Sequence, residues 1–213
     1  MELIRKPIHY NQEGKRIFDQ FYLDEDYNVP EAKDDVQRVI QGTAKVKAED
    51  IRLVENYVRV TGKVCFQILY VTASGDPKPA VLEGKLPFEE MVYAENSGED
   101  QFFVQNLRTE FGVTVVHSRK LSLRVMVELE LGREKLEDEE TTVDIESDIP
   151  VYRKKKKVNL LKLAVAKKDT YRIKEEITLP GTKESIGQIL LTDVDSRKLD
   201  IRLGQDELLL RGE

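Results

Sequence analysis

Residues 58–71 read VRVTGKVCFQILYV, and this stretch decides the fold class. Its even positions are apolar, with Gly62 in the same register, and most of its odd positions are polar. The alternation predicts one half-buried β-strand that exceeds the usual upper length of about ten residues. Gly62 near the middle favours a bend or a β-bulge, which would let one strand serve two parts of a curved sheet.

Further strands follow along the chain. Residues 121–131 carry leucine or valine at every odd position, with mainly polar residues between them. Regularly placed apolar residues predict a long strand over 103–115, and the polar run 117–120 joins the two strands as a hairpin. A second hairpin is expected around Glu55 and Asn56. Shorter strands are expected at 16–23, 80–86 and 141–145.

Only two segments are predicted to be helical, residues 30–41 and 180–191. Pro30 suits the first helical position, and Val36, Val39 and Ile40 give a narrow apolar stripe. A helix this short is stable only when it packs on a sheet. The predicted fold is therefore mainly β, an antiparallel β-sandwich-like module with one short helix, followed by a partial second copy.

The second copy is visible as a repeat, because residues 23–62 reappear at 173–212 without a gap. A fixed-period repeat indicates a protein built from copies of one unit. The second copy stops where the first runs on, so we expect one module at 1–148, a basic linker at 149–157 and a truncated second module at 158–213. Identical or similar residues occupy Glu25/Glu175, Pro30/Pro180, Lys33/Lys183, Val36/Ile186, Val39/Ile189, Ile40/Leu190, Asp50/Asp200, Ile51/Ile201, Arg52/Arg202, Leu53/Leu203, Val58/Leu208, Val60/Leu210 and Gly62/Gly212.

The composition describes a soluble cytosolic protein. Charged residues make up 35% of the 213 residues, but the net charge is only −6, which argues against a nucleic-acid binder. The first residues lack the apolar run of a signal peptide, and nowhere do 18 apolar residues follow one another, so no membrane insertion is expected. The single cysteine, Cys65, excludes an internal disulfide and favours a reducing compartment.

No pattern in the chain predicts catalysis, a cofactor or a metal site. His9 and His117 are far apart, and Cys65 has no histidine near it in sequence, so a packing thiol is the favoured interpretation. The acidic run 24–26 lacks the alternation and central glycine of a calcium loop. No Gly-rich phosphate loop or nucleophile elbow occurs. We therefore expect a non-enzymatic protein.

One charged segment is a candidate partner-binding site. Residues 133–148 are acidic, and a basic run follows them directly. This run could bind an anionic partner, polymer or lipid surface, or it could neutralise the acidic stretch or form a solvated linker. It consists of Arg153, Lys154, Lys155, Lys156 and Lys157.

Several motifs, taken in order, resemble those of the SPOCS domain of spore-coat and envelope proteins. These are the VPEAKDD stretch at 29–35, the strand at 58–71, the LPF at 86–88 and the LSLRVMVELE strand at 121–130. The resemblance covers about residues 1–147 and resumes at about 158.

The resemblance implies a morphogenetic scaffold of the SpoVID and SipL type, which acts at the forespore surface in the mother-cell cytosol and often ends in a LysM domain. Coat-assembly proteins are then the expected partners. Separately, the truncated repeat lacks the strand that would cover its apolar positions, so these should pack either on the first module or on a neighbouring chain, and self-association through the repeat is expected. The alternative is a carbohydrate- or cell-wall-binding module. Sugar sites usually need flat aromatic platforms, and the chain has no tryptophan and only one close tyrosine pair, Tyr22 and Tyr27.

Overall fold

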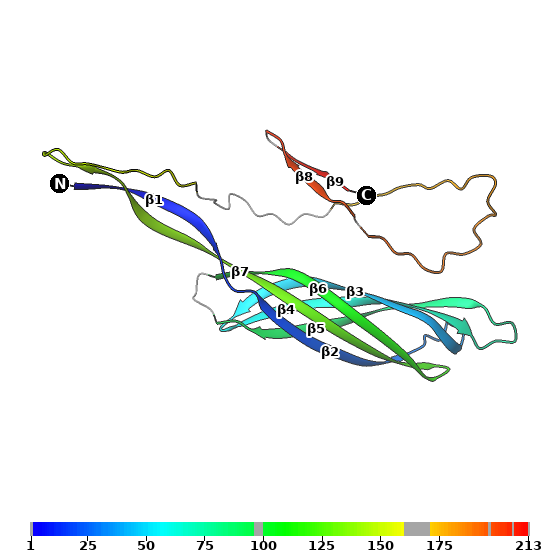
Figure 1. The fold of residues 1–213 in the computed structure, drawn as a ribbon. Helices are drawn as coiled ribbons and strands as arrows, with labels where there is room; N and C mark the ends of the chain where they lie inside the picture. The colour runs from blue at the N-terminus through cyan, green and yellow to red at the C-terminus, as the bar shows by residue number, and fades with distance from the viewer. Residues whose placement is uncertain (1, 96–99, 160–170, 196, 206, 213) are drawn as a thin grey trace.

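The structure, a computed structural model, describes residues 2–95, 100–159, 171–195, 197–205 and 207–212. In this part of the chain all regular structure is antiparallel β, arranged in three sheets (Figure 1). The strands are β1 (Glu2–Glu13), β2 (Ile17–Asn28), β3 (Val36–Val54), β4 (Tyr57–Thr72), β5 (Pro79–Tyr93), β6 (Asp100–His117), β7 (Lys120–Glu146), β8 (Asp200–Leu203) and β9 (Leu208–Arg211).

Sheet A is built around β7. Its first half pairs with β6 on one edge and with β2 on the other, from Lys120 onward. Its second half pairs with β1 on the same edge as β2, and continues to Glu146. Where β6 ends its pairing, β1 and β7 run on as a two-stranded ribbon that leaves the body of the module (Figure 1).

Sheet B consists of β3, β4 and β5, with β4 in the centre, and packs face to face on sheet A. The core lies between β4 and β7, because every second side chain of each strand points inward and is buried. These side chains include Val58, Val60, Val64, Phe66, Ile68 and Tyr70 from β4, and Leu121, Leu123, Val125, Val127, Leu129 and Leu131 from β7.

The long strands and both hairpins predicted from the alternation are therefore confirmed. Glycine at position 62 lets two neighbouring groups approach the β4 backbone closely. A Cβ there would collide with the backbone oxygen of Lys47 and with the ring of Phe88. The expected irregularity lies in the neighbouring strand, where β3 shifts register between Ala48 and Asp50, opposite Gly62. The bulge curves β3 while β4 continues without interruption.

The predicted helices are wrong. Residues 30–33 form a turn closed by a hydrogen bond from the Lys33 amide to the Pro30 carbonyl, 2.9 Å long, and β3 begins at Val36. Two register shifts, after Val36 and after Val39, each insert an extra residue into β3. Inward-facing positions are thereby spaced by three, which imitates a helical stripe in the sequence.

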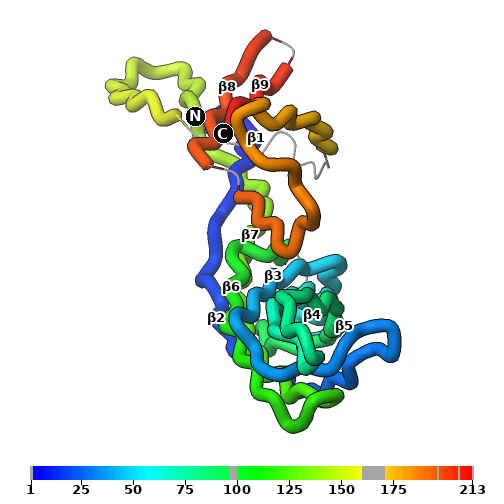
Figure 2. The backbone as a smooth tube through the Cα atoms, turned by 90° about the vertical axis from the view of Figure 1, so that its right-hand side faces the viewer, coloured from blue at the N-terminus to red at the C-terminus, as the bar shows by residue number. Residues whose placement is uncertain are grey.

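The second predicted helix is likewise absent among the described residues 171–195, where only a turn follows Pro180. Farther on, β8 and β9 form a short hairpin that lies apart from the sandwich in both views (Figures 1 and 2). No helix long and apolar enough to cross a membrane occurs in the described part of the chain.

Candidate functional site

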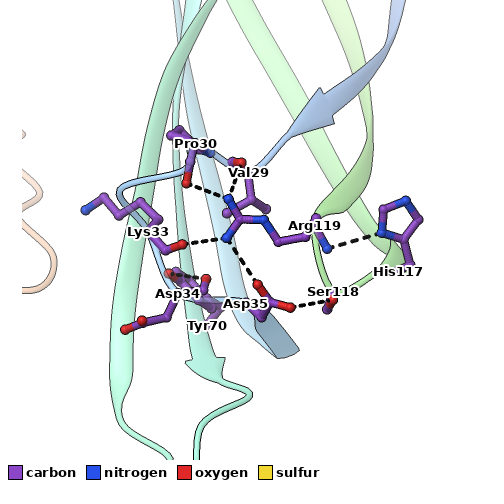
Figure 3. A network of polar contacts seen from close by, with 9 residues as sticks. All are labelled: Val29, Pro30, Lys33, Asp34, Asp35, Tyr70, His117, Ser118 and Arg119. Atoms are coloured by element: carbon purple, nitrogen blue, oxygen red, sulfur yellow. Dashed lines mark hydrogen bonds and ion pairs between the residues drawn. The ribbon is translucent and has the colours of Figure 1, made fainter.

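A polar clamp around Arg119 joins the two sheets at one end of the sandwich (Figure 3). Arg119 lies in the two-residue turn between β6 and β7, and its guanidinium enters the loop between β2 and β3. One nitrogen donates to the carbonyls of Val29 and Pro30, each at 2.9 Å, and the other donates to the Lys33 carbonyl at 2.6 Å. A guanidinium suits this role because its donors form a fixed planar fork.

Asp35 completes the clamp from the start of β3. Its carboxylate accepts from the Ser118 hydroxyl at 2.7 Å and from Arg119 at 3.1 Å. The Ser118 hydrogen bond, followed by the hydrogen bond and charge of Arg119, lowers the pKa of Asp35 despite some desolvation. The buried Tyr70 adds a hydrogen bond to the Asp34 carbonyl, and burial raises the pKa of its phenol.

The backbone of the same turn holds both ends of the loop. The Val29 amide donates to the Arg119 carbonyl at 2.9 Å, and the Val36 amide donates to the Ser118 carbonyl at 2.8 Å. Because Val29 and Val36 are both buried, the loop leaves the core, circles the guanidinium and returns. The clamp therefore fixes the position of the loop between β2 and β3.

The predicted basic site lies beside the ribbon rather than on the sandwich. Arg153 and Lys155 both form ion pairs with Asp144 of β7. These two side chains and the Ile145 amide lower the pKa of Asp144, with the Lys155 hydrogen bond as the largest cause. The structure therefore shows the basic run neutralising part of the acidic stretch.

The remaining lysines of the run, Lys154, Lys156 and Lys157, form no ion pair with another described residue. A groove of about 740 Å³ runs between residues 153–158 and the ribbon. The role of the run as a partner-binding site stays a prediction.

The other charged groups singled out in the sequence form surface ion pairs. His9 contacts Asp138 across the ribbon, and in the acidic run 24–26 Asp24 pairs with Arg124 and Asp26 with Lys120. No cluster of three metal-ligating side chains occurs among the described residues. Cys65 is a free, partly buried thiol on the outer face of sheet B.

The hairpin β8–β9 repeats the geometry of the β3–β4 hairpin 150 positions earlier. Asp200 pairs with Arg211 and Ile201 with Leu210, as Asp50 pairs with Thr61 and Ile51 with Val60. The same side-chain ion pair occurs in both hairpins: Arg52 to Asp50 at 2.6 Å, and Arg202 to Asp200 at 2.7 Å.

The turns that precede the two hairpins also match. The Lys183 amide donates to the Pro180 carbonyl at 2.9 Å, which is the bond and the length found between Lys33 and Pro30. The burial of equivalent side chains differs sharply, however. Val58 and Val60 are fully buried, whereas Leu208 and Leu210 are 64% and 60% exposed.

Reasoning from sequence missed Arg119, because its partners are carbonyl groups more than 80 positions away and a polar turn carries no sign of them. It also missed β1 and the full length of β7. Strands were expected at 121–131 and 141–145 but not between them, and the opposite charges of residues 5–6 and the acidic run are the signal that pairs β1 with β7.

Comparison with known families identifies the central part of the chain. Residues 35–116 match a family model described as SipL, SPOCS domain. The match begins at Asp35 of the clamp and spans β3, β4, β5 and nearly all of β6. The resemblance predicted from the motifs is confirmed over this stretch of the chain. No curated protein and no solved structure matches the chain.

Proposed function

We propose that this chain is a non-enzymatic assembly module that contributes protein–protein contacts during construction of a spore coat or envelope. The SPOCS match supports a role in sporulation. We place the protein on the mother-cell side of the forespore surface, with coat-assembly proteins as partners. A rigid sandwich that extends an open two-stranded ribbon suits such a role, since it offers several faces for contact.

The observation that carries the proposal is the exposed apolar surface of the C-terminal segment. Ile186, Ile189, Ile201, Leu203, Leu208 and Leu210 are 57–84% exposed. Burying a leucine or isoleucine side chain stabilises by roughly 1.5–3 kcal/mol, so these positions favour contact with another surface. They do not pack on the first module, and their exposure supports self-association through this segment.

We further propose that residues 158–213 are the N-terminal part of a second module. The shared turn, register and ion pair support this assignment, as described above. We interpret residues 149–157, which contain the basic run, as the linker between the two modules. A hairpin of two short strands is only marginally stable alone, so the second module needs further strands to complete it.

One observation favours the alternative, a carbohydrate-binding module. Phe18 and Tyr22 of β2 are 72% and 58% exposed and lie on the same outer face of sheet A. They flank Gln20, whose amide donates to the Tyr22 hydroxyl at 2.6 Å, and a groove of about 480 Å³ lies alongside. Aromatic faces with polar neighbours are suited to sugar rings, although Tyr22 already uses its hydroxyl within the strand.

Localisation in a sporulating cell tests the proposal. A fluorescent fusion of the chain, expressed in an endospore former that lacks its own copy, is expected to form a shell around the forespore. Capture from the same cells should recover coat-assembly proteins. Diffuse fluorescence and recovery of wall polymer alone would contradict the assembly role and favour the carbohydrate alternative, which a glycan array with a Phe18→Ala, Tyr22→Ala variant would then examine.

A further inference from the structure

The outer face of sheet B gathers lysines in two adjacent rows that cross all three strands. In the first row Lys45 and Lys85 flank Cys65, and in the second row Lys47 lies opposite Lys63. Cross-strand neighbours on one face are about 5 Å apart, and like charges placed so close repel one another. The two rows favour a carboxylate counterpart, and they lie between the acidic positions Glu83 and Glu89 of the same face.

Only part of this positive charge is paired with a carboxylate of the same module. Lys63 bonds to Glu49, and this contact is the main cause that lowers the pKa of Glu49. Lys47 and Lys85 form no ion pair with another described residue. The two rows therefore keep an excess of positive charge at the centre of the sheet.

An acidic segment of the same chain is seated on Lys45. The ammonium group contacts the Asp193 carboxylate, lies 3.8 Å from Asp195 and donates to the Val194 carbonyl at 3.1 Å. The Asp193 contact is the main cause that raises the pKa of Lys45, and it lowers the pKa of Asp193. Three consecutive residues of the segment thus converge on the single ammonium group of Lys45.

The same segment contains the two partly buried leucines of the C-terminal part. Among the described residues after 159, only Leu190 and Leu191 are partly buried, whereas every other side chain there is exposed. Leu191 lines a groove of about 920 Å³ together with Phe66 and Phe111. Residues 190–195, LLTDVD, thus combine an apolar anchor with two carboxylates that match the basic face.

We propose that the basic outer face of sheet B is a docking site for residues 190–195 of a second copy of this chain. The segment of the second copy would make the same contacts with this face that the segment makes within the single chain. The contact is reversible, because Lys45 and Asp193 are 61% and 66% exposed and exposed ion pairs are weak. The segment can therefore leave its own module and occupy the face of a neighbour, as in other exchanges of identical elements.

The consequence is a head-to-tail contact, because each copy offers one face and one segment. In dilute solution the tethered segment has the advantage of its high effective concentration. Where copies crowd on a surface, exchange between neighbours links them into a chain. As an assembly contact this inference rests on the proposed function, although the contact itself is testable in purified protein.

Two full-length variants separate the face from the segment. Lys45→Glu keeps the segment and destroys the face, whereas Asp193→Lys, Asp195→Lys keeps the face and destroys the segment. Neither can close on itself, so we expect each to be monomeric alone and their equimolar mixture to form a 1:1 heterodimer. Sedimentation velocity at a concentration where the wild type is monomeric measures this, and the heterodimer should dissociate in 0.5 M salt.

Lys15→Glu is the matched control, because Lys15 is exposed on a loop away from sheet B. Mixed with the Asp193→Lys, Asp195→Lys variant it should stay monomeric, since its own segment still covers its face. Carbodiimide, which joins ammonium and carboxylate groups in contact, should link Lys45 to Asp193 within a wild-type monomer. A variant mixture that is no more associated than its components would overturn the proposal, as would a heterodimer whose affinity does not fall as salt is added.

Discussion

The guanidinium of Arg119 lies 3.1 Å from the carboxylate of Asp35, and this ion pair connects the two sheets of the sandwich. Arg119 follows β6 in sheet A, whereas Asp35 precedes β3 in sheet B. The SPOCS match starts at Asp35 and ends three residues before Arg119, so the clamp closes the two ends of the matched stretch. The clamp thus connects the two sheets through polar contacts, and the core between β4 and β7 connects them through apolar contacts.

Replacing Arg119 by alanine is expected to destabilise the protein by about 1.5–3 kcal/mol. The reason is that three carbonyl groups and one carboxylate lose a charged donor in a partly buried loop. Urea unfolding followed by circular dichroism measures the loss. Arg16→Ala, which removes an exposed partner of Glu130, is the control and should change stability little. Equal losses in both variants would contradict a special role for the clamp.

The clamp also predicts how stability depends on pH. The pKa of Asp35 is lowered in the folded protein, chiefly by the Ser118 hydrogen bond, from an ordinary value of 3.8. The stabilisation is therefore fully present above pH 4 and is lost as the pH falls through the lower, folded-state pKa. Unfolding measured from pH 7 to pH 2 should show a smaller acid-dependent loss in Asp35→Asn than in the wild type. Parallel curves would show that Asp35 contributes nothing to acid sensitivity.

Gly62→Ala should destabilise the module by about 1–3 kcal/mol, because the added methyl group meets backbone and a packed ring that cannot move freely. Gly75→Ala is the matched control, since nothing lies within 4 Å of a Cβ at Gly75. Thermal unfolding of both variants measures the difference. A Gly62→Ala variant as stable as the control would mean that the bulge in β3 can absorb the methyl group.

The sheets of this module were predictable because strict alternation of apolar residues has one physical meaning. Val58 through Tyr70 and Leu121 through Leu131 each bury one face, and that pattern predicted the strands and the side chains of the core. The entry to β3 was not predictable in the same way. Its two bulges move Val36 and Val39 onto one face at a spacing that belongs equally to a helix, and only pairing with β4 distinguishes the two.

The sequence predicted which residues of the candidate site are charged, but it did not predict which residues the site contacts. The acidic and basic runs indicated mutual neutralisation, and the pairing of Asp144 with Arg153 and Lys155 agrees with this. The Arg119 clamp and the basic face of sheet B depend on which strands lie side by side. Lys45, Lys63 and Lys85 are far apart in the sequence and meet only through the register of β3, β4 and β5.

Asp144→Asn should release the basic run from the ribbon. The substitution removes the charge that holds Arg153 and Lys155, so residues 151–158 should become more accessible to protease. Limited trypsin digestion followed by mass spectrometry is expected to show faster cleavage after residues 153–157. Asp148→Asn, on an exposed residue close by, is the control. Unchanged cleavage in Asp144→Asn would show that other contacts hold the run in place.

Removal of the C-terminal segment should leave a folded and less associated protein. Both buried strand faces lie before residue 148, so residues 1–148 are expected to unfold cooperatively on heating. The full chain exposes leucines and isoleucines that the first module buries at equivalent positions, so we expect it to self-associate more strongly at equal concentration. Light scattering over a range of concentrations compares the two.

Leu208→Asp, Leu210→Asp in the full chain should reduce association toward that of residues 1–148 without changing the melting of the module. If the shorter chain is unfolded, the module boundary is wrong; if both chains are monomeric and protease leaves the C-terminal segment intact, that segment is covered within its own molecule.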